Sequence, residues 1–133
     1  MRLELVAAYG MGVALPVLEV LRRRTSFETI SGYVDDLIAG GLLLYAARAV
    51  SRKKPRGPVL LVAAWAVLCG GLYGSFFHQV EGGASHDVSG LPNMTVVVIK
   101  GVLYAVALVA LGLSVRAAAE PRSVLRRETR ADA

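Results

Sequence analysis

Five ionisable side chains fall inside or at the ends of apolar stretches of this 133-residue sequence, namely Glu19, Asp35, Asp36, His78 and Lys100. A charged side chain at bilayer depth costs at least about 2.5 kcal/mol, so such residues are rare and usually face protein or water. Two adjacent carboxylates opposite one ammonium group would form a partly neutralised cluster. We therefore expect Asp35 and Asp36 to bind an ion, a proton or a small polar solute, balanced or gated by Lys100. Glu19 and His78 would line the entrance.

Two other interpretations of these charges stay open. Buried polar residues can simply hold helices together, and Asp35 and Asp36 could instead lie beside Arg22–Arg24 at a wet membrane interface. The carboxylates and His78 could also act as general acid and base in an intramembrane enzyme. Whether the protein is an enzyme stays open at this point, and the sequence favours one that is not.

Four possible metal ligands follow the third apolar stretch: His78, Glu81, His86 and Asp87. Imidazole and carboxylate groups suit zinc or another divalent ion. Their spacing matches no closed metal-binding signature, so ordinary loop polarity is the preferred interpretation and the four are weak candidates. Only His78 touches an apolar stretch, whereas a haem needs histidines deep in facing helices. No cofactor is predicted.

The segments that must position these groups are long and apolar. Hydrophobic residues make up 55% of the chain and charged residues 19%, against about 25% charged residues in soluble domains. A helix crosses the hydrocarbon core of a bilayer in about 20 residues, and four segments approach that length, at about 3–21, 27–47, 58–77 and 94–115. The sequence therefore predicts an all-α polytopic membrane protein with a bundle of four transmembrane helices. Residues 1–116 would form one domain, followed by a charged, flexible tail at 117–133.

The second of these segments is the least conventional. Its N-terminal part, 27–36, is semi-polar and contains both aspartates, whereas 37–47 is apolar. The stretch 25–36 could span the bilayer, re-enter it or lie in the interface, and the last two cases would leave three full spans. We favour four spans.

Two smaller features concern helix shape and packing. Pro16 predicts a bend in the first segment, because proline removes a backbone hydrogen bond. Gly70 and Gly74 match the spacing of small residues at which two membrane helices approach closely. We expect this glycine pair to pack within the chain rather than to form a dimer contact.

The net charge of +5 is concentrated between the second and third segments and after the fourth, in Arg48, Arg52, Lys53, Lys54, Arg56, Arg116, Arg122, Arg126, Arg127 and Arg130. Positive residues accumulate on the cytoplasmic side of membrane proteins. We therefore expect both termini and the 48–57 loop to be cytoplasmic in a plasma or inner membrane, against which only Arg22–Arg24 argue. This orientation places all five ionisable side chains in the outer half of the bundle. No aromatic residues alternate with these charges, so nucleic acid is not an expected partner.

Together these patterns predict a small membrane transporter or channel-like protein. It would be a homo-oligomer or associate with other membrane subunits, since four short helices enclose little space. The alternative is a non-catalytic accessory or anchor subunit of a larger membrane complex, whose charges would meet those of a partner within the bilayer. An intramembrane enzyme is the third possibility.

Overall fold

The computed structural model describes residues 3–22, 30–82, 86–87 and 89–131, and side chains are described for 3–21, 33–82, 86–87 and 89–120. The described residues fold into four helices: α1 (Leu3–Arg22), α2 (Ile30–Ser51), α3 (Gly57–Glu81) and α4 (Asn93–Ala131). The prediction of an all-helical chain is confirmed. Each helix corresponds to one of the apolar segments, although the predicted start of the second segment, 27–29, lies outside the described residues.

The helices are longer than the apolar segments that predicted them. α3 begins at Gly57 with Pro58 in its first turn, where proline is well tolerated because its missing N–H would be unpaired there in any case. α4 continues to Ala131, and three alanines at 117–119 favour helix directly after Val115. Arg116 and Glu120 also form an ion pair one turn apart, with 3.6 Å between Nε and Oε1. The predicted flexibility of 117–133 stays a prediction.

Three of the helices are long and apolar enough to cross a membrane, over Leu3–Leu21, Gly57–Glu81 and Asn93–Glu120. These three helices indicate a membrane location. α2 is not among them, although its 22 residues would suffice in length. Asp35, Asp36 and Arg48 reduce its hydropathy. For this reason the sequence also leaves open whether the second segment spans the bilayer.

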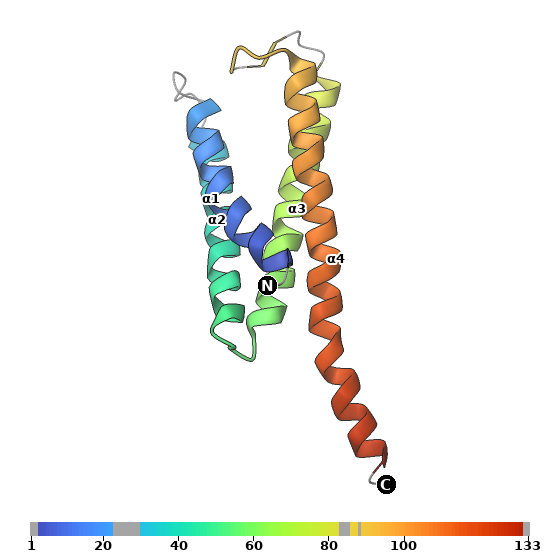
Figure 1. The fold of residues 1–133 in the computed structure, drawn as a ribbon. Coiled ribbons are helices and arrows are strands. Elements are labelled where there is room, and N and C mark those ends of the chain that lie inside the picture. Colours follow the sequence, from blue (N-terminus) through green and yellow to red (C-terminus); the bar gives the residue numbers. More distant parts are fainter. Residues whose placement is uncertain (1–2, 23–29, 83–85, 88, 132–133) are drawn as a thin grey trace.

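The helices form two antiparallel pairs. α1 packs along α2, and α3 packs along α4. The two pairs meet mainly through α2 and α3, whereas the contact between α1 and α4 is much smaller. Figure 1 shows the pairs close together beside the short 52–56 loop and apart at the other end. The bundle is therefore V-shaped.

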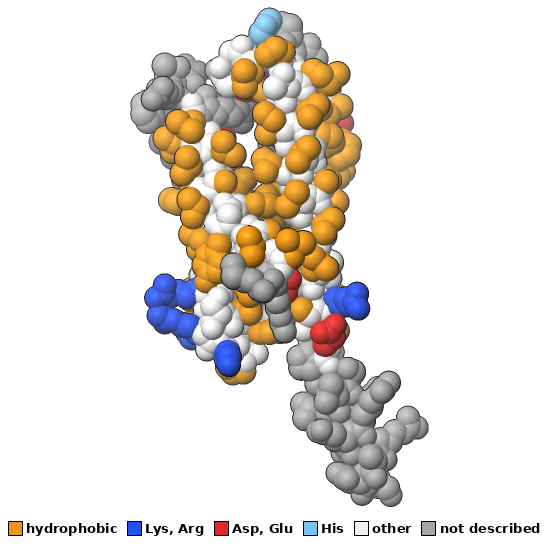
Figure 2. Space-filling model, viewed as in Figure 1, with side chains coloured by type: hydrophobic (Ala, Val, Ile, Leu, Met, Phe, Trp, Pro, Cys, Tyr) orange, Lys and Arg blue, Asp and Glu red, His pale blue; other side chains and the backbone are white. Residues whose placement is uncertain are grey.

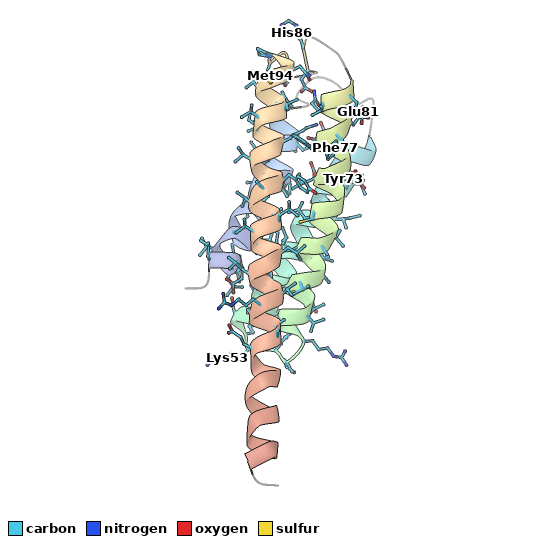
Figure 3. The ribbon with its side chains drawn as sticks, turned by 90° about the vertical axis from the view of Figure 1, so that its right-hand side faces the viewer. Lys53, Tyr73, Phe77, Glu81, His86 and Met94 are labelled. Carbon is cyan, nitrogen blue, oxygen red and sulfur yellow. The ribbon has the colours of Figure 1, made fainter. Side chains whose placement is uncertain are left out.

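The outer surface is apolar along the helices and charged at one end. Figure 2 shows hydrophobic side chains over most of the visible face and lysine and arginine side chains at the end that contains the 52–56 loop. Lys53 and His86 mark opposite ends of the bundle in Figure 3, and α4 extends beyond the Lys53 end. Large apolar side chains that face outward, such as Leu37 and Val109, suit contact with lipid.

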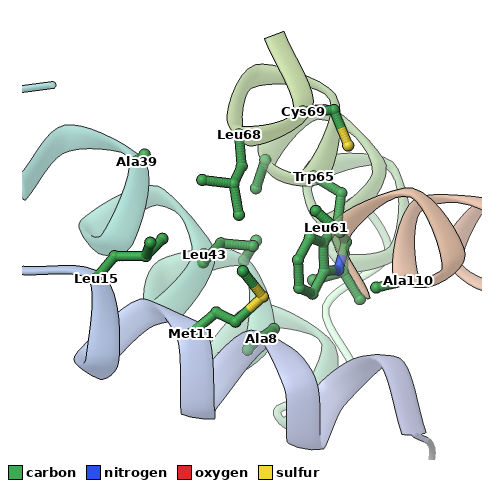
Figure 4. Close-up of a cluster of buried hydrophobic side chains, with 14 of the residues drawn as sticks. Ala8, Met11, Leu15, Ala39, Leu43, Leu61, Trp65, Leu68, Cys69 and Ala110 are labelled. Carbon is green, nitrogen blue, oxygen red and sulfur yellow. The ribbon is translucent and has the colours of Figure 1, made fainter. Parts of the chain in front are cut away.

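The core lies in the half of the bundle where the two pairs converge. It is built around Trp65, which is completely buried, and around Leu43 and Leu68 (Figure 4). Alanines such as Ala64 and Ala110 fill much of the remainder, and these small residues allow the helix backbones to approach closely. This packed half closes the V at its base.

The backbones of α1 and α2 approach closely at Gly12 and Gly40. A Cβ atom added to Gly40 would lie 2.7 Å from the carbonyl oxygen of Gly12. The prediction that Gly70 and Gly74 pack within the chain is wrong, because a Cβ atom at either position would meet nothing within 4 Å. Both lie on an exposed face of α3.

α1 is bent, and its N-terminal part turns toward α3 and α4 (Figure 1). Pro16 lies inside α1 and cannot donate to the carbonyl of Gly12, which permits such a bend. As a result, Leu3, Glu4 and Ala7 reach the α4 segment at 105–113. This contact closes the fourth side of the bundle near its base only.

Candidate functional site

A cavity of about 770 Å³ lies between the two helix pairs, in the half of the bundle where they diverge. All four helices contribute to its walls, and Ser89 and Leu91 from the α3–α4 loop reach its outer end. Figure 2 shows the hollow between the pairs. Most of its lining is apolar, from Leu15, Leu18, Leu21, Ile38, Ala39, Val67, Leu68, Leu72, Val96, Ile99 and Leu103.

Four of the five ionisable residues singled out in the sequence line this cavity: Glu19, Asp35, Asp36 and Lys100. The antiparallel course of the chain brings them together. α1 ends where α2 begins, and α4 starts at that same end of the bundle. Their gathering is thus a structural observation, whereas the binding role that we expect of them stays a prediction.

The four residues differ in their exposure. The Glu19 residue is 8% exposed, Asp36 and Lys100 are half-buried, and Asp35 is exposed. Three carboxylates and one ammonium group give the described part of the lining a formal charge of minus two. The arrangement of Asp35 and Asp36 relative to Arg22–Arg24 lies outside the described side chains.

Lys100 is held by α3. Its Nζ donates to Oε1 of Gln79 over 2.9 Å and to the carbonyl oxygen of Ser75 over 3.3 Å. These two residues are four apart and so lie on one face of α3, which the ammonium group of Lys100 spans from α4. Charged hydrogen bonds of this kind fix the position of the ammonium group at the cavity wall.

Gln79 connects Lys100 to the loop that follows α3, and the sequence analysis did not identify it. Its Nε2 donates to Oδ1 of Asn93 over 2.5 Å and to Oδ1 of Asp87 over 3.2 Å. A polar, uncharged residue in the last turns of an apolar helix was the available signal. The role of Gln79 becomes recognisable only when the positions of Asn93 and Lys100 beside it are known.

The turn at 87–91 places the loop against the cavity. Oδ2 of Asp87 accepts a hydrogen bond from the backbone N–H of Ser89 over 3.2 Å. The backbone N–H of Asp87 donates to the carbonyl oxygen of Leu91, which closes the turn. Gly90 has a φ of 79°, a left-handed conformation that glycine adopts without steric cost.

His78 is exposed and is not among the residues that line the cavity. The structure therefore does not bring it to the cluster, and its expected place at the entrance has no support from its position. Within the described part of the chain, no three histidine, cysteine, aspartate or glutamate residues gather closely enough to hold a metal ion. Of the four weak metal candidates, His78, Glu81 and His86 are exposed, and Asp87 accepts a hydrogen bond from Gln79 instead.

Aromatic side chains hold α3 against α4 beside the cavity. The ring of Phe76 stacks on that of Tyr104, with 6.3 Å between centroids and 24° between planes. Tyr73 meets Tyr104 edge-on at 6.4 Å. Gly101 leaves room for this contact, because an added Cβ atom would lie 3.2 Å from Cε2 of Phe76. The α3–α4 pair therefore has its own packing in the half where the bundle is open.

Comparison of the chain with protein-family models, with curated proteins and with solved structures gives no match. Function is therefore inferred from the residues and geometry of this chain.

Proposed function

We propose that the protein is a small membrane transporter or channel-like protein that takes up an ion, a proton or a small polar solute in the cavity between its helix pairs. One observation carries this proposal. Glu19, Asp35, Asp36 and Lys100 come from three helices and line the same cavity. Ionisable groups at bilayer depth are costly, so their convergence on a hollow favours a binding role over scattered structural roles.

The shape of the bundle supports a one-sided binding site. The cavity occupies the half where the helix pairs diverge, and the core around Leu43 and Trp65 fills the other half. A solute that enters the cavity would meet this packed region as a barrier. Release on the other side would require one helix pair to rock against the other about the 52–56 loop, as in other carriers that alternate their access.

The orientation is part of the same proposal. The 52–56 loop between α2 and α3, which contains Arg52, Lys53, Lys54 and Arg56, lies at the end of the bundle opposite the cavity (Figure 1). With these residues and both termini in the cytoplasm, the cavity would open outward. α2 would then be a fourth span, since it runs along both α1 and α3 and carries its aspartates into the cavity wall. Association of several copies, or of this chain with other subunits, is also proposed.

Flux through the purified protein tests this function. We would reconstitute the full chain in liposomes and measure the passage of protons, sodium, potassium and alkyltrimethylammonium ions. The double variant Asp35→Asn, Asp36→Asn should lower the flux at least tenfold. Glu81→Gln removes a carboxylate at the same end of the bundle but outside the cavity, and should leave the flux unchanged.

Equal flux in the native protein and the double aspartate variant would refute the proposed role of the cluster. If no tested solute passes through the native protein, the alternative of an accessory or anchor subunit would be preferred. An unfolding measurement on each variant separates loss of the site from loss of the fold.

A further inference from the structure

We propose that the ligand of this cavity is an amphipathic organic cation, with one positively charged head and an apolar body. The inference rests on the proposed function in one respect only, because it places the ligand in the same cavity. It goes further in naming the class of compound. The observation behind it is that the charged side chains lie in the outer part of the cavity, above an apolar floor.

Charged side chains line only the outer part of the cavity, although apolar residues such as Leu21, Val96 and Ile99 lie nearer the mouth still. On α1, Glu19 lies one turn nearer the mouth than Leu15, and on α2, Asp36 lies nearly one turn nearer than Ala39. At 1.5 Å of rise per residue, these steps correspond to about 6 Å and about 4.5 Å of depth. The carboxylates thus lie in the outer part of the wall that α1 and α2 form, and small or branched apolar side chains form the part below them.

The second helix pair likewise has no polar side chain among its deepest lining residues. Ser75 lies two turns nearer the mouth than Leu68 on α3, and Lys100 lies nearly one turn nearer than Leu103 on α4. Leu68 and Leu15 belong to the buried core at the base of the V, together with Ala39 (Figure 4). The floor of the cavity is therefore the upper surface of the core, and no charged side chain of the described residues lies on it.

A small inorganic ion fits this lining poorly. A desolvated divalent cation such as calcium takes six to eight oxygen ligands at short distance. In the described part of the chain, the cavity carboxylates form no group that could hold a metal ion. An ion would also gain nothing from the leucine, isoleucine and valine side chains that make up most of the wall. An organic cation with an apolar body would satisfy both parts of the lining.

The charge and the size of the cavity point to the same ligand. Three carboxylates against one ammonium group favour a positive head, and Lys100 is already hydrogen-bonded to Gln79. The volume of about 770 Å³ lies within the range of about 300–1,000 Å³ that is typical of pockets for drug-sized ligands. Burial of the body would add about fourfold in affinity for each methylene group removed from water.

A series of alkyltrimethylammonium ions tests the inference with one constant head. We would measure equilibrium binding of the tetramethyl, butyl, hexyl and octyl members to the full chain in nanodiscs, with protein-free nanodiscs as background. Saturable affinity should rise about fourfold per methylene. Neutral 1-octanol should bind at least tenfold more weakly than octyltrimethylammonium, and the Asp35→Asn, Asp36→Asn variant should remove most of this preference for charge.

Two neighbouring glycines provide a matched pair of variants for the apolar body. Gly71 lines the cavity and Gly70 does not, and a Cβ atom at either position would meet nothing within 4 Å. Gly71→Leu should therefore fill part of the cavity and lower the affinity for the octyl ion at least tenfold, with little change for tetramethylammonium. Gly70→Leu makes the same chemical change outside the cavity and should alter neither affinity.

Several outcomes would overturn the inference. One is affinity that does not depend on chain length, and another is equal binding of octyltrimethylammonium and 1-octanol. Equal loss of affinity in Gly70→Leu and Gly71→Leu would also contradict it. Flux of an inorganic ion that depends on Asp35 and Asp36, without saturable binding of the octyl ion, would overturn this inference and leave the proposed function standing. The expected binding without any flux would support the ligand class and refute transport.

Discussion

Substitution of Gly40 by alanine tests the packing of α1 on α2. The added Cβ atom would lie 2.7 Å from the carbonyl oxygen of Gly12 and 3.0 Å from Cγ of Pro16. Ordinary contact begins at 3.4 Å, so the two helices would have to separate by about 0.7 Å to relieve the closest clash. The opposing atoms belong to backbone and to a proline ring, which cannot turn away as a flexible side chain can.

Gly41→Ala is the matched control, because a Cβ atom there meets nothing within 4 Å. Both substitutions gain about 1 kcal/mol in helix propensity, since glycine is less favourable than alanine by that amount. This gain cancels in the comparison. Overpacking of a tight contact costs about 1–3 kcal/mol, so Gly40→Ala should be about 1–3 kcal/mol less stable than Gly41→Ala.

Reversible unfolding of the two variants in mixed detergent micelles would measure this difference. Far-UV circular dichroism would follow the helices, and the single Trp65 would report on the core through its fluorescence. Gly12→Ala should be affected less, because its Cβ atom first meets the mobile side chain of Leu44 at 2.8 Å. If Gly40→Ala unfolds at the same denaturant concentration as Gly41→Ala, the close approach of α1 and α2 is refuted.

Three further substitutions use the same unfolding assay, followed by circular dichroism alone for Trp65→Phe. Trp65→Phe should change the free energy of unfolding by less than about 1 kcal/mol. The loss of ring area is offset because the substitution removes a buried N–H that has no partner among the described residues. A loss as large as the roughly 3–5 kcal/mol typical of Trp→Ala would contradict this and indicate that the N–H is hydrogen-bonded. Ser114→Ala removes a buried hydroxyl group that is likewise unpaired in the described structure and should stabilise the protein by about 1 kcal/mol; destabilisation would contradict this. Gln79→Leu removes the acceptor for Lys100 and should cost about 1.5–3 kcal/mol. An unchanged midpoint in this last variant would rule out a role for the hydrogen bond in stability.

The sequence was sufficient to predict the helices and the convergence of the charged residues. Apolar runs of bilayer length identify the helices, and antiparallel helices with short connections must return each charge to the same end. Topology therefore brings Glu19, Asp36 and Lys100 to the same end of the bundle, where all three line the cavity. His78 follows the same rule along the chain, but it lies beyond Ser75, the outermost α3 residue of the lining, and is exposed outside the cavity.

Contacts between helices were not predictable, because each depends on the register of two segments. Gly10 lies two residues before Gly12, and Gly41 directly follows Gly40. Only Gly12 and Gly40 lie in the contact between α1 and α2. The spacing of Gly70 and Gly74 misled for the same reason, since a motif within one helix does not state which face a partner covers. The role of Gln79 likewise depends on how α4 is placed beside α3.

The semi-polar start of α2 has a consequence for the synthesis of the protein. Membrane segments leave the ribosome one after another, and three of the four helices have enough hydropathy to enter lipid independently. α2 would bring Asp35 and Asp36 with it, at about 2.5–3.5 kcal/mol for each aspartate near the centre of a helix. α1 is already present when α2 emerges, and α2 can pack against it through the close contact of Gly40 with Gly12. We therefore expect α1 and α2 to insert as a helical hairpin, so that the first helix acts as an insertion partner for the second.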